Sequence, residues 1–109
     1  MRWSRWRPFP NPDNGDFLSA PFGAGVYELR RGDTKELVLV GRGKNVAYRM
    51  TSLLPRPRGQ GTRRNAEKPK YVTLHLPNIQ YRCRACPSDG EAKTLEAKLL
   101  TRQNYIFRT

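Results

Sequence analysis

Residues 25–49 read GVYELRRGDTKELVLVGRGKNVAYR, and this stretch decides the fold. Its apolar and β-branched side chains predict two strands, 25–30 and 36–41, because such residues suit a buried or half-buried strand. The connection at 31–35 is short and carries Gly, Asp and Thr, so the two strands should form a hairpin. The glycine-bracketed bend at 41–43 should then lead into a helix.

That helix is predicted over residues 45–54. Asn45 is a good N-cap, and Pro55 should end the helix. Arg49 lies at the edge of the apolar arc, whereas Tyr48 points well away from it. The arc itself is formed by Val46, Met50, Leu53 and Leu54. An arginine beside a buried face is held in place, which is what a site residue requires.

The rest of the chain predicts a third strand and a second helix. Residues 55–70 are rich in Pro, Gly and Arg and predict a loop, and residues 71–76 fit a strand or a helix equally well. Alternation predicts a strand over 80–85. Ser88 and Glu91 have the spacing of a capping box, which predicts the start of the last helix. The expected fold is therefore α/β (α+β): a small central three-stranded sheet, mainly antiparallel, flanked by helices.

Glu96 falls inside the apolar stripe of this last helix, which is marked by Ala92, Leu95 and Leu99. A carboxylate that faces a core is costly unless it is paired or binds a metal. Glu96 is therefore a candidate site residue. The alternative is that it lies at the edge of the stripe and pairs with an arginine.

The chain of 109 residues carries a formal net charge of +12, from 21 Lys and Arg against 9 Asp and Glu. Such a charge favours polyanionic partners, nucleic acid first. Nine of the basic residues lie between Gly41 and Lys70: Arg42, Lys44, Arg49, Arg56, Arg58, Arg63, Arg64, Lys68 and Lys70. The candidate nucleic-acid contacts among them are Arg42, Lys44, Arg56, Arg58, Arg63 and Arg64, although a charged loop that only keeps the chain soluble is the alternative.

Membrane binding is not expected. The charged stretch has no amphipathic face, and no apolar run approaches the roughly 18–20 residues of a membrane span. The N-terminus has basic residues but no apolar signal region, so a cytoplasmic protein is expected.

Residues 1–20 are predicted as an irregular, basic and aromatic N-terminal segment, followed by one domain over 21–109. Its prolines disfavour regular structure. Trp3 and Trp6 are interleaved with arginines, so they could stack on bases. Packing on the domain is an equally good alternative.

Cys83 and Cys86 form a single Cys-x-x-Cys pair. A structural zinc site needs four ligands, and His75 is the only other natural contributor, so the set is one ligand short. These residues are expected to be two ordinary cysteines in a reducing compartment.

The order of strand, turn, strand, Gly bend, helix with Asn45 and Arg49, third strand and helix with Glu96 resembles the GIY-YIG nuclease family. The resemblance covers about residues 22–102. Its two tripeptides correspond to Gly25-Val26-Tyr27 and Leu39-Val40-Gly41. It implies that Tyr27 contacts the nucleophilic water, that Arg49 neutralises the scissile phosphate and that Glu96 binds one divalent ion, Mg²⁺ or Mn²⁺. Gly25, Gly41 and Asn45 would be the structural residues of the motif.

The chain departs from the family pattern where Leu39 stands in place of the second tyrosine. Tyr71 and His75 are the candidates to replace that phenol. Asn104 follows Glu96 by only eight residues, closer than the family's asparagine is expected.

The resemblance implies a metal-dependent DNA endonuclease, with DNA favoured over RNA. Single strands are the favoured substrate, because duplex cleavage usually needs two active sites. The sequence fits a monomer and a dimer alike. The main alternative is a nucleic-acid-binding module that has lost catalysis, and a third is a basic assembly protein of ribosomal type.

Overall fold

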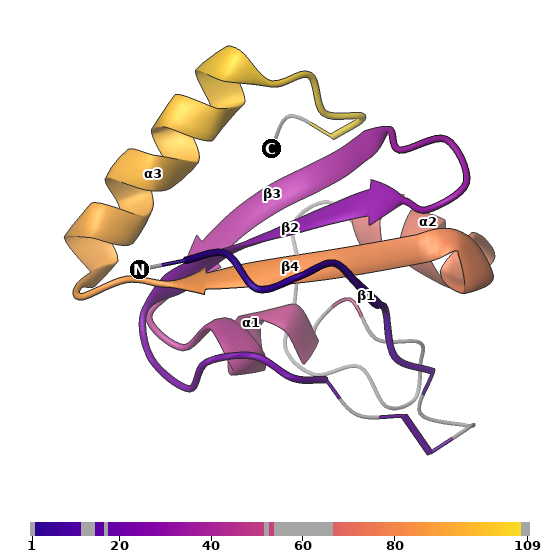
Figure 1. The fold of residues 1–109 in the computed structure, drawn as a ribbon, viewed down its shortest axis with the longest axis horizontal. Helices are drawn as coiled ribbons and strands as arrows, with labels where there is room; N and C mark the ends of the chain where they lie inside the picture. The colour runs from indigo at the N-terminus through magenta and orange to yellow at the C-terminus, as the bar shows by residue number, and fades with distance from the viewer. Residues whose placement is uncertain (1, 12–14, 17, 52, 54–66, 108–109) are drawn as a thin grey trace.

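The computed structural model describes residues 2–11, 15–16, 18–51, 53 and 67–107. In chain order the elements are β1 (Arg7–Pro8), β2 (Gly25–Arg31), β3 (Leu37–Gly43), α1 (Val46–Thr51), α2 (Glu67–Leu74), the 3₁₀ turn η2 (Leu76–Asn78), β4 (Ile79–Ala85) and α3 (Asp89–Arg102). The strands form one antiparallel sheet in the order β1-β4-β2-β3 (Figure 1). None of the described helices is long and apolar enough to cross a membrane.

The sheet has four strands, where the sequence predicts three. The additional strand is β1, whose Arg7 and Pro8 pair with Tyr81 and Gln80 of β4. Proline is tolerated there because β1 is an outer strand, which can leave a backbone nitrogen without a ladder partner. Phe9 follows directly and is buried in the core. The N-terminal segment is therefore attached to the sheet, although its prolines suggest irregular structure.

The strand β3 is longer than predicted, since it continues through Arg42 and Gly43 where the sequence suggests a bend. In the β2–β3 register Tyr27 lies opposite Gly41. Because side chains alternate along a strand, Arg42 points to the face opposite that of Gly41. Gly41 and Arg42 therefore face the candidate site from opposite faces of the sheet.

The two helix N-termini that the sequence predicts from capping residues are confirmed. The Asn45 Oδ1 atom accepts a hydrogen bond from the Tyr48 backbone nitrogen at 3.1 Å, so Asn45 caps α1. The Ser88 hydroxyl accepts from the Glu91 nitrogen at 3.2 Å at the start of α3. The helix α1 ends at Thr51 in the described chain, three residues before the predicted end.

The helix α2 overlaps the end of the predicted loop. Pro69 argues against a long helix before Tyr71, and it lies in the first turn of the short helix α2. Nitrogens of a first turn have no acceptor within the helix, so proline is tolerated there. Residues 71–74, which fit a strand or a helix by sequence, are helical. Residues 54–66 lie outside the described part of the chain, together with the candidates Arg56, Arg58, Arg63 and Arg64.

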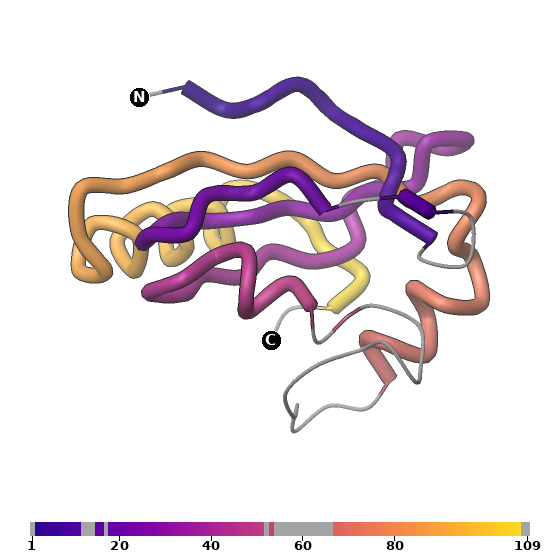
Figure 2. Tube along the Cα trace, turned by 90° about the horizontal axis from the view of Figure 1, so that it is seen from below, coloured from indigo at the N-terminus to yellow at the C-terminus, as the bar shows by residue number. Residues whose placement is uncertain are grey.

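Two clusters of apolar side chains cover the two faces of the sheet. The larger cluster lies under α1 and α2 and contains Tyr27, Leu29, Leu39, Val46, Met50, Leu53, Val72, Ile79 and Tyr81. The smaller cluster lies under α3 and contains Val26, Val40, Ala92 and Tyr105, with Trp3 packed against it. In Figure 2 the N-terminal segment, drawn in indigo, runs along β4, drawn in orange.

After α3 the chain returns along the outer strand β3. The backbone nitrogens of Ile106 and Phe107 donate to the carbonyl oxygens of Leu37 and Val38 at 3.1 and 2.8 Å. The Tyr105 hydroxyl donates to the Glu28 carboxylate, which is 1% exposed. The same carboxylate accepts a hydrogen bond of 2.8 Å from Nε of Arg82. The C-terminal segment is thereby fastened to the sheet.

Candidate functional site

Tyr27 packs its phenol against the backbone of Gly41, its direct partner on the neighbouring strand. A Cβ added to Gly41 would lie within 3.0 Å of three Tyr27 atoms: the hydroxyl oxygen, Cζ and Cε1. Only glycine leaves room for the phenol in this arrangement. The Tyr27 side chain is 1% exposed, so it belongs to the core and to the candidate site at once.

Glu96 approaches the same end of β3 from α3. Its Oε1 lies 3.4 Å from Nε of Arg42, and Nη1 of Arg42 also donates to Oδ1 of Asp89 at 3.0 Å. Glu96 therefore pairs with an arginine. Burial raises the pKa of Glu96 above its ordinary value, and the positive charges of Arg42, Lys68 and Arg49 partly oppose this rise.

Arg49 reaches the site from α1 and is exposed. A Cβ added to Gly43 would lie 3.2 Å from Cβ of Arg49, so the start of this side chain packs on the end of β3. Because β3 is the last strand in the order of the sheet, side chains from its two faces can meet around its edge. Tyr27, Arg49 and Glu96 thus approach Gly41, Gly43 and Arg42 respectively, which span about 7 Å of strand.

Gly25, the first glycine of the motif, is required by packing as well. A Cβ there would lie 2.9 Å from Cγ2 of Val46 and closer still to the carbonyl oxygen of Arg84. Leu39 occupies the position of the missing tyrosine and is completely buried in the larger core. Its side chain therefore fills core space on the same face of the sheet as Tyr27.

Lys68 is a site residue that the sequence suggests only as one charge among many. It lies in α2, is 8% exposed, and shares the buried face of that helix with Val72. Its charge acts on Glu96. The spacing of four residues between Lys68 and Val72 places both on one helix face, but Pro69 conceals the helix in the sequence.

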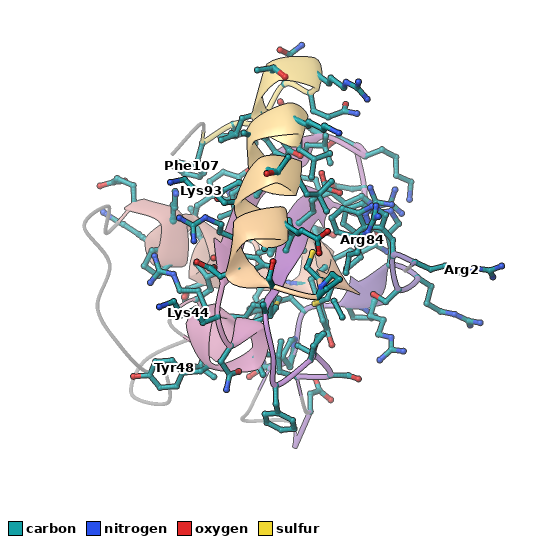
Figure 3. All side chains as sticks on the ribbon, turned by 90° about the vertical axis from the view of Figure 1, so that its left-hand side faces the viewer. Arg2, Lys44, Tyr48, Arg84, Lys93 and Phe107 are labelled. Carbon is teal, nitrogen blue, oxygen red and sulfur yellow. The ribbon has the colours of Figure 1, made fainter. Side chains whose placement is uncertain are left out.

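The other basic candidates fall on two sides of the molecule. Figure 3 shows Lys44, Tyr48 and Lys93 on one side of α3, and Arg84 and Arg2 on the other. Lys44 is exposed, and the Tyr48 ring, which the sequence predicts to point outward, is 61% exposed. The side that carries Lys44 is also the side of α1, from which Arg49 projects.

Trp3 and Trp6 contact arginines of the sheet. The guanidinium of Arg82 lies 4.3 Å from the centre of the Trp3 ring and 4.7 Å from that of Trp6. Arg30 lies 4.3 Å from the Trp6 ring. These cation–π contacts are the packing on the domain that the sequence leaves open as one alternative. Base stacking by the two tryptophans stays a prediction.

Tyr71, His75 and Asn104 lie elsewhere. The Tyr71 hydroxyl accepts a hydrogen bond of 3.2 Å from Arg31, and the Tyr71 and His75 rings lie 4.4 Å apart. Arg31 is four residues beyond Tyr27 along β2, a distance of about 13 Å. Asn104 is exposed, two residues before the backbone bond from Ile106 to the start of β3. The structure brings none of the three to residues 41–43.

The carboxylates of the site suit only an open metal site. In the described part of the chain no three His, Cys, Asp or Glu side chains gather into a metal-binding group. Mg²⁺, however, keeps several waters and is commonly bound by one or two carboxylates plus substrate phosphates. Glu96 therefore fits a water-rich magnesium or manganese site that a phosphate would complete.

The two cysteines are free, and Cys83 is buried in the larger core. Burial raises the pKa of its thiol to about 12. A thiol must lose its proton to bind a metal, so this burial opposes metal binding. The expectation of ordinary cysteines is in accord with this environment.

Comparison with known proteins identifies the fold. No protein-family model matches the chain, and no curated protein matches its sequence. Among solved structures it is similar to the GIY-YIG N-terminal endonuclease domain of UvrC from Thermotoga maritima, bound to its catalytic divalent cation, magnesium. The TM-score is 0.63, with 90% of this chain and 97% of that chain covered, at 19% sequence identity. The chain thus shares the fold of a GIY-YIG domain.

Proposed function

We propose that this chain is a metal-dependent endonuclease that hydrolyses phosphodiester bonds in DNA. The observation that carries the proposal is the convergence of Tyr27, Arg49 and Glu96, from β2, α1 and α3, on residues 41–43. These residues are 69 positions apart in sequence at their extremes, so only the fold brings them together. A solved structure to which the chain is similar is an endonuclease domain bound to magnesium.

Each residue has a chemical task in this proposal. The exposed guanidinium of Arg49 binds the scissile phosphate, since its fork donates two hydrogen bonds to phosphate oxygens. The Tyr27 hydroxyl accepts a hydrogen bond from the attacking water and so orients it toward the phosphorus. Glu96 holds the divalent ion, which supplies charge neutralisation for the phosphate and the leaving oxygen. Lys44 binds the phosphates that flank the cleaved bond.

Single-stranded DNA is the proposed substrate. The Tyr48 ring is 61% exposed and directly precedes Arg49 in α1. An exposed aromatic ring can stack on an unpaired base, an interaction worth about 1–3 kcal/mol per base. A ring beside a phosphate-binding arginine would favour a strand whose bases are not paired.

The test is cleavage of labelled single-stranded DNA, duplex DNA and RNA by the purified chain with Mg²⁺, with Mn²⁺ and with a chelator. We expect metal-dependent cleavage of single-stranded DNA and a loss of about 100-fold or more in Glu96→Gln. Glu36→Gln is the matched control, because Glu36 is exposed in the β2–β3 turn. Cleavage that is undiminished in Glu96→Gln would refute the proposed role of this carboxylate.

A binding module without catalysis is the second candidate. It is favoured by the burial of Leu39 where the family has a phenol, which removes one hydroxyl from the site. In that case the chain binds single-stranded DNA but cleaves neither DNA nor RNA with either metal. The same assay therefore distinguishes the two functions.

A further inference from the structure

The guanidinium of Arg42 is paired with two carboxylates in this structure. Its Nη1 lies 3.0 Å from Oδ1 of Asp89, and its Nε lies 3.4 Å from Oε1 of Glu96. The two acids are seven residues, about two turns, apart on α3, so both face β3. The side chains of Arg42 and Glu96 are 31% and 24% exposed, so the pair is only partly open to water.

Positive side chains lie around Glu96 before any ligand arrives. Among the described residues, the charges of Arg42, Lys68 and Arg49 act on its carboxylate. Each of these charges repels a divalent cation and so lowers the affinity of Glu96 for it. A phosphate group that binds to these cations offsets the repulsion.

Arg42 can exchange its contact with Glu96 for a stronger contact with a phosphate. The Nε atom of Arg42 is buried and has no aligned hydrogen-bond acceptor among the described residues, although Oε1 of Glu96 is close. The pair is thus held by charge without a well-directed hydrogen bond. A guanidinium binds a phosphate with two parallel hydrogen bonds, so a nucleic-acid phosphate can compete for Arg42.

We propose that Arg42 holds Glu96 while the site is without nucleic acid and transfers to a phosphate when nucleic acid binds, so that Glu96 binds a divalent ion tightly only in the nucleic-acid complex. This inference rests on the proposed function, because it takes Glu96 as the metal-binding carboxylate. Arg42 is then a positioning residue that sets the order of binding, nucleic acid before metal. By linkage, the metal must tighten nucleic-acid binding by the same factor.

The experiment measures Mn²⁺ affinity rather than cleavage. Isothermal titration follows Mn²⁺ binding to the full chain alone and with a short single-stranded oligonucleotide that a gel shows to stay intact, after subtraction of Mn²⁺ binding to the oligonucleotide. We expect the oligonucleotide to tighten Mn²⁺ binding to the wild-type chain by about tenfold or more. Arg42→Gln should bind Mn²⁺ more tightly than the wild type without the oligonucleotide, so that its gain from the oligonucleotide is smaller.

Controls separate this inference from its premise. Arg102→Gln removes the same charge from an exposed position in the last turn of α3 and should behave as the wild type. Glu96→Gln should lose the protein-specific Mn²⁺ site in both states; if it does not, the metal is elsewhere and the proposed function itself fails. If Glu96→Gln loses the site but Arg42→Gln binds Mn²⁺ no more tightly than the wild type, only the role of Arg42 is overturned. If Arg42→Gln does not fold, Arg42→Lys takes its place, because the shorter lysine side chain cannot reach both Asp89 and Glu96. In Arg42→Lys the oligonucleotide should raise the Mn²⁺ affinity by a smaller factor than in the wild type. An unchanged factor contradicts the inference.

Discussion

At the scale of single residues, the site depends on the absence of a side chain at Gly41. The Tyr27 phenol occupies the place of a side chain on the opposite strand. The position of Tyr27 in the first tripeptide therefore requires a glycine at position 41 in the second. Two short motifs that are weak when taken alone are linked by one packing contact.

Gly41→Ala should lower the free energy of unfolding by about 1–3 kcal/mol, because the new Cβ would overlap the Tyr27 ring and force it to move. Gly23→Ala is the matched control, since no atom lies within 4 Å of a Cβ at that position. Urea unfolding of both variants measures the difference. Equal stabilities would show that the ring can yield at no cost.

Tyr27→Phe should separate the two roles of this residue. The phenylalanine ring keeps the core filled, so the free energy of unfolding should change by no more than about 1 kcal/mol. Cleavage should fall by about 100-fold or more if the hydroxyl positions the attacking water. A variant with unchanged cleavage would assign Tyr27 to the core alone.

At the scale of elements, the sequence predicts the hairpin, α1 and α3 because their signals are local. Asn45 and the pair Ser88 and Glu91 act within one helical turn, and the caps they predict are present. The strand β1 and the helix α2 are missed because prolines mark them as irregular, although Pro8 lies on an outer strand and Pro69 in a first turn. Position within an element decides whether proline is tolerated, and a sequence does not reveal that position.

The candidate site shows the same limit. Periodicity correctly turns Tyr48 outward, but Glu96 is 24% exposed and pairs with an arginine, which is the alternative that the sequence leaves open. Periodicity cannot indicate that Arg42 would pair with Glu96, because this contact depends on the register of β3 against α3. The sequence does not identify Lys68 as a site residue for the same reason, because its neighbours in space come from other elements.

The C-terminal segment should make stability depend on alkaline pH. Burial, and then the neighbouring Glu28 carboxylate, raise the pKa of Tyr105 above its usual value of about 10. A raised pKa stabilises the folded state below about pH 10, and this stabilisation is lost as the pH rises further. The free energy of unfolding of the wild type should therefore fall by about 1.4 kcal/mol per pH unit more than that of Tyr105→Phe above this pH.

Urea unfolding between about pH 8 and pH 11.5 measures the two profiles. At the lower pH, Tyr105→Phe should be less stable than the wild type by about 1–3 kcal/mol, because the buried Glu28 loses a donor. Parallel profiles would contradict the raised pKa of the Tyr105 hydroxyl.

At the scale of the whole molecule, the charge of +12 should dominate affinity for nucleic acid. Binding through phosphates releases counterions, so the logarithm of the association constant falls linearly with the logarithm of salt concentration. For a single strand with at least about three phosphate contacts, the slope should be about −2 or steeper. Fluorescence anisotropy of a labelled oligonucleotide across a series of NaCl concentrations measures it, and a flat response would exclude phosphate-driven binding.

The bonds that Ile106 and Phe107 make to Leu37 and Val38 have a consequence for behaviour in concentrated solution. The run Leu37–Val40 is apolar, uncharged and rich in β-branched residues, and it lies on an outer strand. A strand of this kind with a bare edge is a template on which another chain can add, and such growth leads to aggregation. The C-terminal segment already takes up the carbonyl groups at the start of that edge. Shortening the chain at Asn104 removes the bonds of Ile106 and Phe107 and should therefore yield a protein that associates edge to edge, so these two residues protect the outer strand.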